Sequence, residues 1–341
     1  MNENLSKSYD KHYKVLLIIP IAILIISLSY IFLFSAKTGD IISKDISLTG
    51  GTSIQVNSGS DVDALTKALE SKFSDVSIRK VTDSLSGKQL AFVIETSANS
   101  SEVVLFLEQY LGYKLNSDNS SVEFTGPSIG AGFYIQLLLA ILFAFIFMGT
   151  VVFFIFADST KIRLFIIFLS LLAPSLFFIF KIISINQAFI ISFAVLAVSL
   201  YFYVRYSIPS LAVVFCAFAD MTMTLAVVNF LGMKISSAGI IAFIMLIGYS
   251  VDTDILLTTR VLKRRGENVN SRIWGSFKTG ITMTLTAIVV VLIGYFLTAS
   301  FSKVLHQLFF ILTVGLFFDI LNTWITNASI IKWYTVKHKI E

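Results

Sequence analysis

Long apolar runs separated by short polar segments set the pattern of this chain. A helix that crosses a membrane needs about 20 largely apolar residues. Eight runs of that kind cover roughly residues 15–36, 133–157, 162–182, 186–204, 209–231, 236–259, 279–300 and 305–332. The pattern therefore predicts a polytopic α-helical membrane protein with about eight spans. The first run could also be a signal peptide, but it is long for one and Phe34 stands where a small residue should precede the cleavage site, so we interpret it as an anchor.

Residues 37–130 form the one sizeable polar region, and its pattern changes from strand to helix periodicity and back. Alternation predicts strands at 52–56, 76–81, 89–96 and 122–124, and helical spacing predicts helices at 61–73 and from 100 or 101 to 111. The order β-α-β-β-α-β is that of the ferredoxin-like α+β motif. About 90 residues are enough to bury a core of their own. We therefore expect one folded domain here, inserted between the first and second spans.

Basic residues indicate the orientation, because cytoplasmic loops are enriched in lysine and arginine. Alternate loops and the two ends of the chain carry most of them: Lys7, Lys11, Lys14, Lys161, Arg163, Arg205, Arg260, Lys263, Arg264, Arg265, Arg272, Lys278, Lys332, Lys337 and Lys339. The opposite loops between the later spans hold only Lys181, Lys234 and Lys303. We expect a protein of the cytoplasmic membrane with both termini in the cytoplasm and the domain 37–130 outside.

This orientation divides the chain into parts. Residues 1–36 form the cytoplasmic N-terminus and the first span, residues 131–334 the transmembrane bundle, and residues 335–341 a cytoplasmic tail. The formal net charge is +5, but the bases lie in predicted cytoplasmic loops, so we expect no nucleic-acid partner. The single cysteine, Cys216, can form no intrachain disulfide. The outer domain shows no metal-ligand cluster, phosphate loop or nucleophile–base pair, and we expect neither a cofactor nor enzymatic activity.

Four aspartates lie inside the predicted spans: Asp220, Asp252, Asp254 and Asp319. A carboxylate at the centre of a span costs roughly 2.5 kcal/mol or more, so such residues usually have a function. Serine or threonine could serve helix packing, whereas a proton relay requires a titratable group. We therefore interpret the aspartates as proton-coupling groups.

Polar residues at helical spacing accompany the aspartates. Asn322, Thr323 and Thr326 follow Asp319, and Thr279, Thr282 and Thr286 follow Lys278. These threonines and asparagines are interpreted first as interhelical hydrogen-bonding groups, with Thr282, Thr286 and Asn322 as candidate supporting residues. Lys278 is either an ion-pair partner or a cation at the membrane surface.

Asp252 and Asp254 are two residues apart on one helix, so they point about 200° apart and cannot serve one site as a pair. We expect Asp252 to be the principal titrating group, with Asp220 and Lys278 as its neighbours. Burial raises the pKa of a carboxyl group, and a nearby cation lowers it. A carboxyl group subject to both effects can therefore exchange protons.

The segment Gly248-Tyr-Ser-Val-Asp-Thr-Asp-Ile-Leu-Leu-Thr-Thr-Arg260 resembles a motif of the SecF family in its archaeal form. Three further segments are similar to it in the same order: Leu48-Thr-Gly-Gly-Thr52, Gly126-Pro-Ser-Ile-Gly130 and Lys278-Thr-Gly-Ile-Thr-Met-Thr-Leu-Thr286. The segment from Ile208 to Asp220 is also similar to a later span of the family. The resemblance covers most of the chain outside residues 158–203.

The resemblance implies an RND-superfamily helical bundle and an accessory subunit of the Sec protein translocase, which assists polypeptide export. It implies a SecD-like partner subunit, a SecYE-type channel and the translocating polypeptide as partners, within membrane lipid, and coupling to proton flow. A heterodimer should have a seam of small and polar residues, for which we name Gly232, Ser236, Ser237 and Gly239.

Two departures from the family pattern stand out. Residues 158–204 add an extra helical hairpin, which we expect to face lipid at the periphery. The family's bacterial members have Asn-Asp where this chain has Asp252-Thr253, and arginine where it has Lys278. The matching carboxylate is thus displaced by one residue, about 100° around the helix.

Two other functional classes fit parts of the pattern. An RND-type proton-coupled exporter of lipid or small molecules would use the same intramembrane acids, but such exporters usually carry two outer domains and twelve spans in one chain. A membrane-anchored sensor needs no aspartates in three spans, and no signalling domain is visible.

Overall fold

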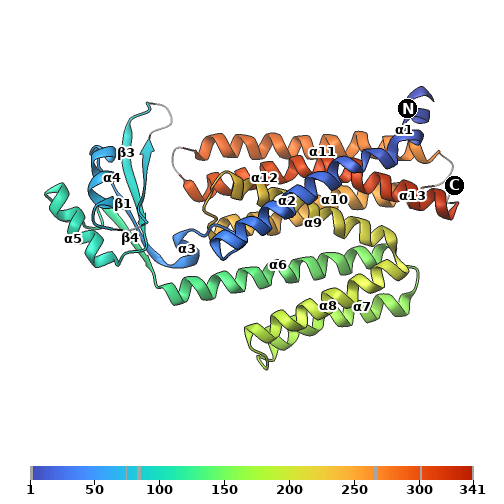
Figure 1. Cartoon of the computed structure of the whole chain (residues 1–341), viewed down its shortest axis with the longest axis horizontal. Helices are drawn as coiled ribbons and strands as arrows, with labels where there is room; N and C mark the ends of the chain where they lie inside the picture. The colour runs from blue at the N-terminus through green and yellow to red at the C-terminus, as the bar shows by residue number, and fades with distance from the viewer. Residues whose placement is uncertain (1–2, 74, 83–85, 265–267, 300–301, 340–341) are drawn as a thin grey trace.

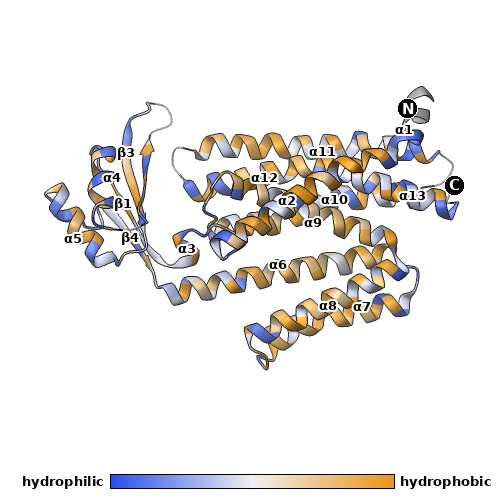
Figure 2. Cartoon of the chain, viewed as in Figure 1, coloured by the Kyte–Doolittle hydropathy of each residue, from blue (hydrophilic) through white to orange (hydrophobic). Residues whose placement is uncertain are grey.

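The computed structural model describes residues 3–73, 75–82, 86–264, 268–299 and 302–339. Arg265 of the basic cluster lies outside the described residues. A small α+β domain sits at one end of a bundle of long helices, and both chain termini lie at the other end (Figure 1). Apolar residues dominate the helices, and polar residues gather in the small domain and near the termini (Figure 2).

The small domain has the predicted ferredoxin-like fold. Its elements are β1 (Gly51–Val56), α4 (Val62–Glu70), β2 (Ser77–Thr82), β3 (Gln89–Thr96), α5 (Ser100–Leu111) and β4 (Ser120–Thr125). The four strands form an antiparallel sheet in the order β2-β3-β1-β4. Both helices cover the face of the sheet that points away from the bundle (Figure 1).

Alternation along the strands explains the core of this domain. Ile54 on β1 lies opposite Ile94 on β3 and Val122 on β4, so these side chains share one face. The Asp61 carboxylate accepts a hydrogen bond from the Asp63 amide and caps α4. Leu65, one turn into that helix, is fully buried in the resulting apolar cluster.

Eight helical segments of the described chain are long and apolar enough to cross a membrane, which confirms the predicted fold class. The helices are α1 (Glu3–Leu16), α2 (Ile18–Thr38), α6 (Pro127–Phe156), α7 (Thr160–Pro174), α8 (Ile185–Tyr206), α9 (Ile208–Phe230), α10 (Ser237–Lys263), α11 (Val269–Thr298), α12 (Lys303–Leu321) and α13 (Ala328–His338). Short π-helical turns, η1 (Ser175–Ile179) and η2 (Asn322–Asn327), continue α7 and join α12 to α13. The amphipathic α1 and both π-helical turns were not predicted from the sequence.

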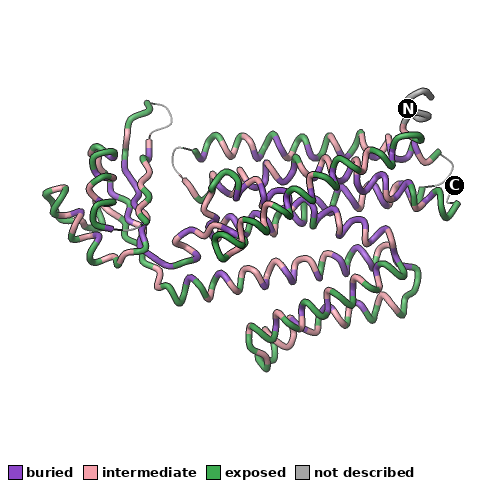
Figure 3. The backbone as a smooth tube through the Cα atoms, in the orientation of Figure 1, coloured by how far each residue is buried: buried purple, intermediate pink, exposed green. Residues whose placement is uncertain are grey.

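The helices α9 and α10 form the centre of the bundle. Of their apolar stretches 67% and 56% of the residues are buried, against 17% for the first span. Helix α10 packs against α6, α9, α11 and α12, and α9 also contacts α2. Figure 3 shows that many residues of these central helices are buried. The buried polar side chains of these helices, such as Asp220 on α9 and Asp254 on α10, therefore face other helices rather than lipid.

The extra hairpin consists of α7, η1 and α8, and it lies beside α6 at the edge of the bundle (Figure 1). Tyr203 of α8 stacks on Phe153 of α6 with ring centroids 5.0 Å apart. The outward side chains Phe168 and Ile190 are 70% exposed. The hairpin thus presents a broad apolar face on the side away from the central helices.

Two glycine motifs cross where the domain meets the bundle. A Cβ added to Gly130 in α6 would lie 2.6 Å from the Gly50 amide nitrogen, and Gly50 itself has φ +83°. Side chains at both positions would collide with backbone, so these glycines permit the close crossing. The motifs at 48–52 and 126–130 are therefore a structural joint between the domain and the helices.

Ion pairs reinforce this joint. The Lys303 ammonium at the start of α12 lies 3.2 Å from Asp45, which caps the short helix α3 (Ile46–Thr49), and also pairs with Glu95 of β3. We refer to this arrangement as the Lys303 clamp. It connects the bundle, the joint and the sheet through one side chain.

Asp40, just beyond α2, makes a second link. It pairs with Lys44 at 2.6 Å and accepts a hydrogen bond of 2.9 Å from the Tyr134 hydroxyl on α6. Burial raises the pKa of Asp40, but these two partners and a hydrogen bond from the Ile41 amide more than offset it and leave the pKa below its ordinary value. We refer to this arrangement as the Asp40 bridge.

Candidate intramembrane carboxylate site

Three of the predicted aspartates meet in the centre of the bundle. Asp220 on α9, Asp254 on α10 and Asp319 on α12 are each at most 1% exposed. They lie close enough to interact electrostatically. We call these three residues the carboxylate cluster, and each has its own set of neutral hydrogen-bond donors.

Asp220 is held by donors from two other helices. The Ser250 hydroxyl on α10 donates to its Oδ2 at 2.6 Å, and the Asn322 amide on η2 donates to its Oδ1 at 2.6 Å. Thr326, one turn further along, donates to the Asn322 Oδ1 at 3.2 Å. Three helices are thus tied together around the Asp220 carboxylate.

Asp319 receives hydroxyl groups only. The Thr253 hydroxyl on α10 lies 3.2 Å from both carboxylate oxygens, and the Thr323 hydroxyl donates to Oδ1 at 3.0 Å. The Thr253 hydroxyl also lies 2.9 Å from the Ser250 carbonyl and so has competing acceptors. A hydroxyl has one proton to donate, so Thr253 must divide it among these acceptors.

Asp254 has the sparsest environment of the three. Asn327 of η2 donates to its Oδ1 at 2.8 Å, whereas its Oδ2 is buried and has no hydrogen-bond partner in the described protein. The same Asn327 amide also lies 3.3 Å from the Thr258 hydroxyl. One face of Asp254 is therefore open to a further donor or to a proton.

The cluster has no cationic partner among the described residues. None of the ion pairs found there includes Asp220, Asp254 or Asp319. A carboxylate inside a membrane is costly and usually marks an ion or proton pathway. A proton gained by a carboxyl group turns an acceptor into a donor, so proton exchange here would rearrange bonds between α9, α10 and η2.

Asp252 lies elsewhere. It is exposed on the outer face of α10, in a surface hollow that it shares with Arg260, Lys263 and Arg264. Asp220 points into the cluster instead, and Lys278 is exposed on α11. The expectation that Asp220 lies beside Asp252 is therefore wrong, whereas Lys278 is exposed on the neighbouring helix and forms no ion pair with Asp252 among the described residues. The reason is the 200° separation itself, because Asp254 takes the inward face and Asp252 is left outside.

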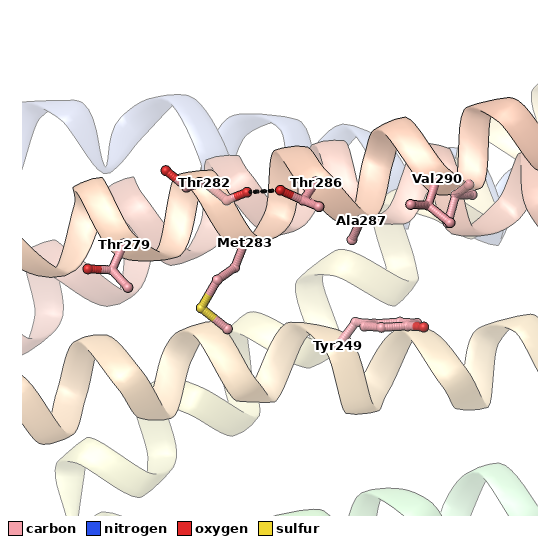
Figure 4. A pocket seen from close by; sticks show the side chains of 8 residues that line it. Tyr249, Thr279, Thr282, Met283, Thr286, Ala287 and Val290 are labelled. Atoms are coloured by element: carbon pink, nitrogen blue, oxygen red, sulfur yellow. Dashed lines mark hydrogen bonds between the residues drawn. The ribbon is translucent and has the colours of Figure 1, made fainter.

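The threonine stripe of α11 also lies outside the cluster. Thr282 and Thr286 are exposed and donate to the carbonyls one turn back, those of Lys278 and Thr282. They line a groove of about 690 Å³ between α10 and α11, across from Tyr249 (Figure 4). Thr282, Thr286 and Lys278 thus share an outward surface with Asp252, whereas Asn322 belongs to the cluster.

Two of the four residues of the predicted partner seam are internal, whereas Gly232 is exposed and Ser237 is half-buried. Ser236 is 4% exposed, and its hydroxyl donates to Gln307 at 2.6 Å. A Cβ on Gly239 would lie 3.0 Å from the same Gln307 side chain. These small residues let α10 pack against α12 within this chain, so the prediction that they face a partner is wrong for Ser236 and Gly239.

Asn327 was missed by the sequence analysis, and Thr253 was not singled out. An α-helix advances about 100° per residue, so Asn327 should lie about 140° away from Asn322. The π-helical turn advances less per residue and brings Asn327 onto the same side. The nearest sequence signal is the unusual density of asparagine and threonine between 322 and 327.

Comparison with known proteins agrees with this architecture. The family model "Protein export membrane protein SecD/SecF, C-terminal" matches residues 179–337. The protein-export membrane protein SecF of Methanocaldococcus jannaschii is 32% identical over 96% of this chain and 98% of its own length. The SecF protein of Methanothermobacter thermautotrophicus is 44% identical over 38% of this chain and 46% of its own length.

A solved structure shows the same fold. The crystal structure of SecDF from Thermus thermophilus, a translocon-associated membrane protein, superposes with a TM-score of 0.59 at 18% identity over 95% of this chain. This chain spans 38% of that longer SecDF chain. The match along nearly the whole length of an archaeal relative decides the family: the chain belongs to the SecF family of protein-export membrane proteins.

Proposed function

We propose that this protein is an accessory subunit of the Sec translocase that assists polypeptide export and is driven by proton exchange at the carboxylate cluster. The observation that carries the coupling is the burial of Asp220, Asp254 and Asp319 together without a cation in the described protein. A purely structural cluster needs no ionisable group, because serine and threonine can form the same interhelical bonds.

The hydrogen bonds suggest how a proton would move helices. Asn322 and Asn327 both belong to η2 and hold Asp220 and Asp254, which lie on two different helices. When either carboxyl group changes its protonation state, its preferred partners change. Because one π-helical turn contacts both, the two states would favour different positions of η2 relative to α9 and α10.

The orientation follows from the distribution of charge. Lysines and arginines concentrate at the end of the bundle that carries both termini, and the ferredoxin-like domain is at the opposite end. The positive-inside rule supports a cytoplasmic location for the termini and an external one for the domain. The domain would then lie where an exported chain emerges from a SecYE-type channel.

The outward surface of α10 and α11 is the proposed contact with a SecD-like subunit. It combines Asp252, Lys278 and the groove lined by Thr282 and Thr286. Exposed ionisable and polar groups on a membrane helix are unfavourable against lipid, and a partner helix would cover them. The solved SecDF structure, of whose chain this protein covers 38%, favours this partner.

Carboxamide variants test the coupling. Asp220→Asn, Asp254→Asn and Asp319→Asn each keep the side-chain shape and remove the titratable proton. Each should leave membrane insertion and SecD pairing intact and should abolish the gradient-dependent part of export in vesicles. Asp252→Asn, on the same helix as Asp254, is the matched comparison and should retain that part.

Different results exclude different parts of the proposal. Full gradient-dependent export in all three cluster variants would exclude proton coupling at the cluster. Loss of gradient-dependent export in Asp252→Asn alone would show that Asp252 is the coupling residue. Isolation of the protein as a homotrimer with bound small molecules, without a SecD-like chain or a channel, would favour an RND-type exporter over a translocase subunit.

A further inference from the structure

A cleft opens between the first and last spans at the end of the bundle that carries the termini. Its volume is about 380 Å³, and its lining residues come from α1, from Leu17 between α1 and α2, and from α13. Figure 1 shows α1 and α13 at the same end of the bundle. Its walls are formed by Tyr13, Lys14, Leu17, Ser329, Ile330 and Trp333. None of these residues takes part in the carboxylate cluster, and the proposed export function does not use them.

Two lysines lie at this cleft or next to one of its walls. Lys14 lines it, and the Lys337 ammonium lies 5.0 Å from the centre of the Trp333 ring. Neither lysine takes part in an ion pair among the described residues. The nearest acid on α1, Asp10, is already engaged by Lys332 at 2.5 Å.

The residues that line the cleft are of the types found at the membrane surface. Leu17 and Ile330 are apolar, and Trp333 is 39% exposed. Tryptophan and tyrosine prefer the level of lipid headgroups, where one part of the ring is apolar and another meets water. Basic pockets between spans at this level bind anionic headgroups.

We propose that this cleft binds an anionic membrane lipid. Lys14 and Lys337 hold the phosphodiester group, and the first part of the lipid chain packs between Leu17, Ile330 and Trp333. The volume suits a headgroup with a short length of chain. A soluble phosphate would use the lysines but not the apolar walls, which is why the charge and the walls together favour a lipid.

Lipid retention tests the proposal with the intact protein in nanodiscs that contain phosphatidylglycerol and phosphatidylcholine. Native mass spectrometry should detect phosphatidylglycerol retained after detergent release. The double variant Lys14→Gln/Lys337→Gln should weaken retention by about fivefold per lysine, the contribution of a base near an anionic surface. Lys161→Gln removes the same charge at the base of α7, on another face of the bundle, and should change retention less than twofold.

Tryptophan quenching gives a local readout. The chain has 3 tryptophans, so Trp274→Phe/Trp324→Phe leaves Trp333 as the single reporter. Phosphatidylglycerol brominated near the headgroup should quench it more strongly than brominated phosphatidylcholine, and the double lysine change should remove the difference. Glycerol phosphate in solution should not compete.

Four results would overturn the proposal. Equal retention in the double lysine variant excludes a site at this cleft. If Lys161→Gln lowers phosphatidylglycerol retention as much as the double lysine variant does, the lipid is attracted to the basic surface in general. Competition by glycerol phosphate, or a polypeptide cross-linked at position 333 in place of lipid, identifies a different occupant.

Discussion

Replacing Asn327 by leucine should destabilise the bundle specifically through Asp254. In the described protein Asn327 donates to the Oδ1 atom of Asp254 at 2.8 Å, and the Oδ2 atom has no hydrogen-bond partner. Leucine has a similar volume and cannot donate, so the variant removes the Asn327 hydrogen bond from a buried carboxyl group. A lost partner of this kind costs about 1–3 kcal/mol, although measured interhelical bonds in membranes are often weaker, about 0.6–1.7 kcal/mol.

A double-mutant cycle isolates that interaction. Asp254→Leu removes the group that Asn327 satisfies, so the second leucine should cost little in that background. We expect a coupling free energy of at least about 1 kcal/mol between positions 254 and 327. The free energy of unfolding in mixed micelles, measured by denaturant titration, gives each corner of the cycle.

Thr282→Val is the matched control. Thr282 is exposed and bonds only to its own helix at the Lys278 carbonyl, so its replacement should change stability by about 0.5 kcal/mol or less. Additive effects of Asn327→Leu and Asp254→Leu, within about 0.5 kcal/mol, would refute the reasoning. They would mean that η2 does not hold Asp254 as the hydrogen bonds indicate.

Three further outcomes are expected. Lys303→Met should lower the free energy of unfolding by about 1–3 kcal/mol, because Asp45 and Glu95 lose their shared cation, and limited proteolysis should cut the joint faster. Asp40 has a lowered pKa in the folded protein, so its bridge stabilises above the ordinary pKa of about 4 and is lost as the pH falls through the folded value; Asp40→Asn should remove that part of the acid sensitivity in a pH series of unfolding measurements. Deleting residues 160–204 should leave insertion of the remaining spans intact in a protease-protection assay, and loss of all export assistance by a normally inserted variant would contradict a peripheral role for the hairpin.

Elements governed by local periodicity were predictable from the sequence. The strands of the outer domain follow two-residue alternation, and α4 follows from its Asp61 cap and the helical spacing of Leu65 and Leu69, both fully buried. The spans follow from length and apolar composition. These signals depend on each segment alone, so they survive without knowledge of what packs beside it.

It was harder to predict which face of α10 points into the bundle. The sequence shows that Asp252 and Asp254 point in different directions, but which direction is inward depends on the helices around them. A signal was available in the polar neighbours of Asp254, since Ser250 and Thr258 lie one turn away on either side and both are fully buried. In a membrane bundle the outer face meets lipid, so the longer polar stripe marks the interior. By that criterion Asp254, rather than Asp252, is the inward residue.

The hydrogen bonds from η2 to the cluster could not be predicted from α-helical spacing. Asn322 and Asn327 are five residues apart, which is about 140° in an α-helix but only about 50° where hydrogen bonds close one residue later. The wider turn lets both amides face the cluster, one at Asp220 and the other at Asp254. A regular α-helix would keep one of these bonds and turn the other amide away. The site therefore requires the π-helical turn. A change in carboxyl protonation that released either amide would remove one of the hydrogen bonds that stabilise this turn.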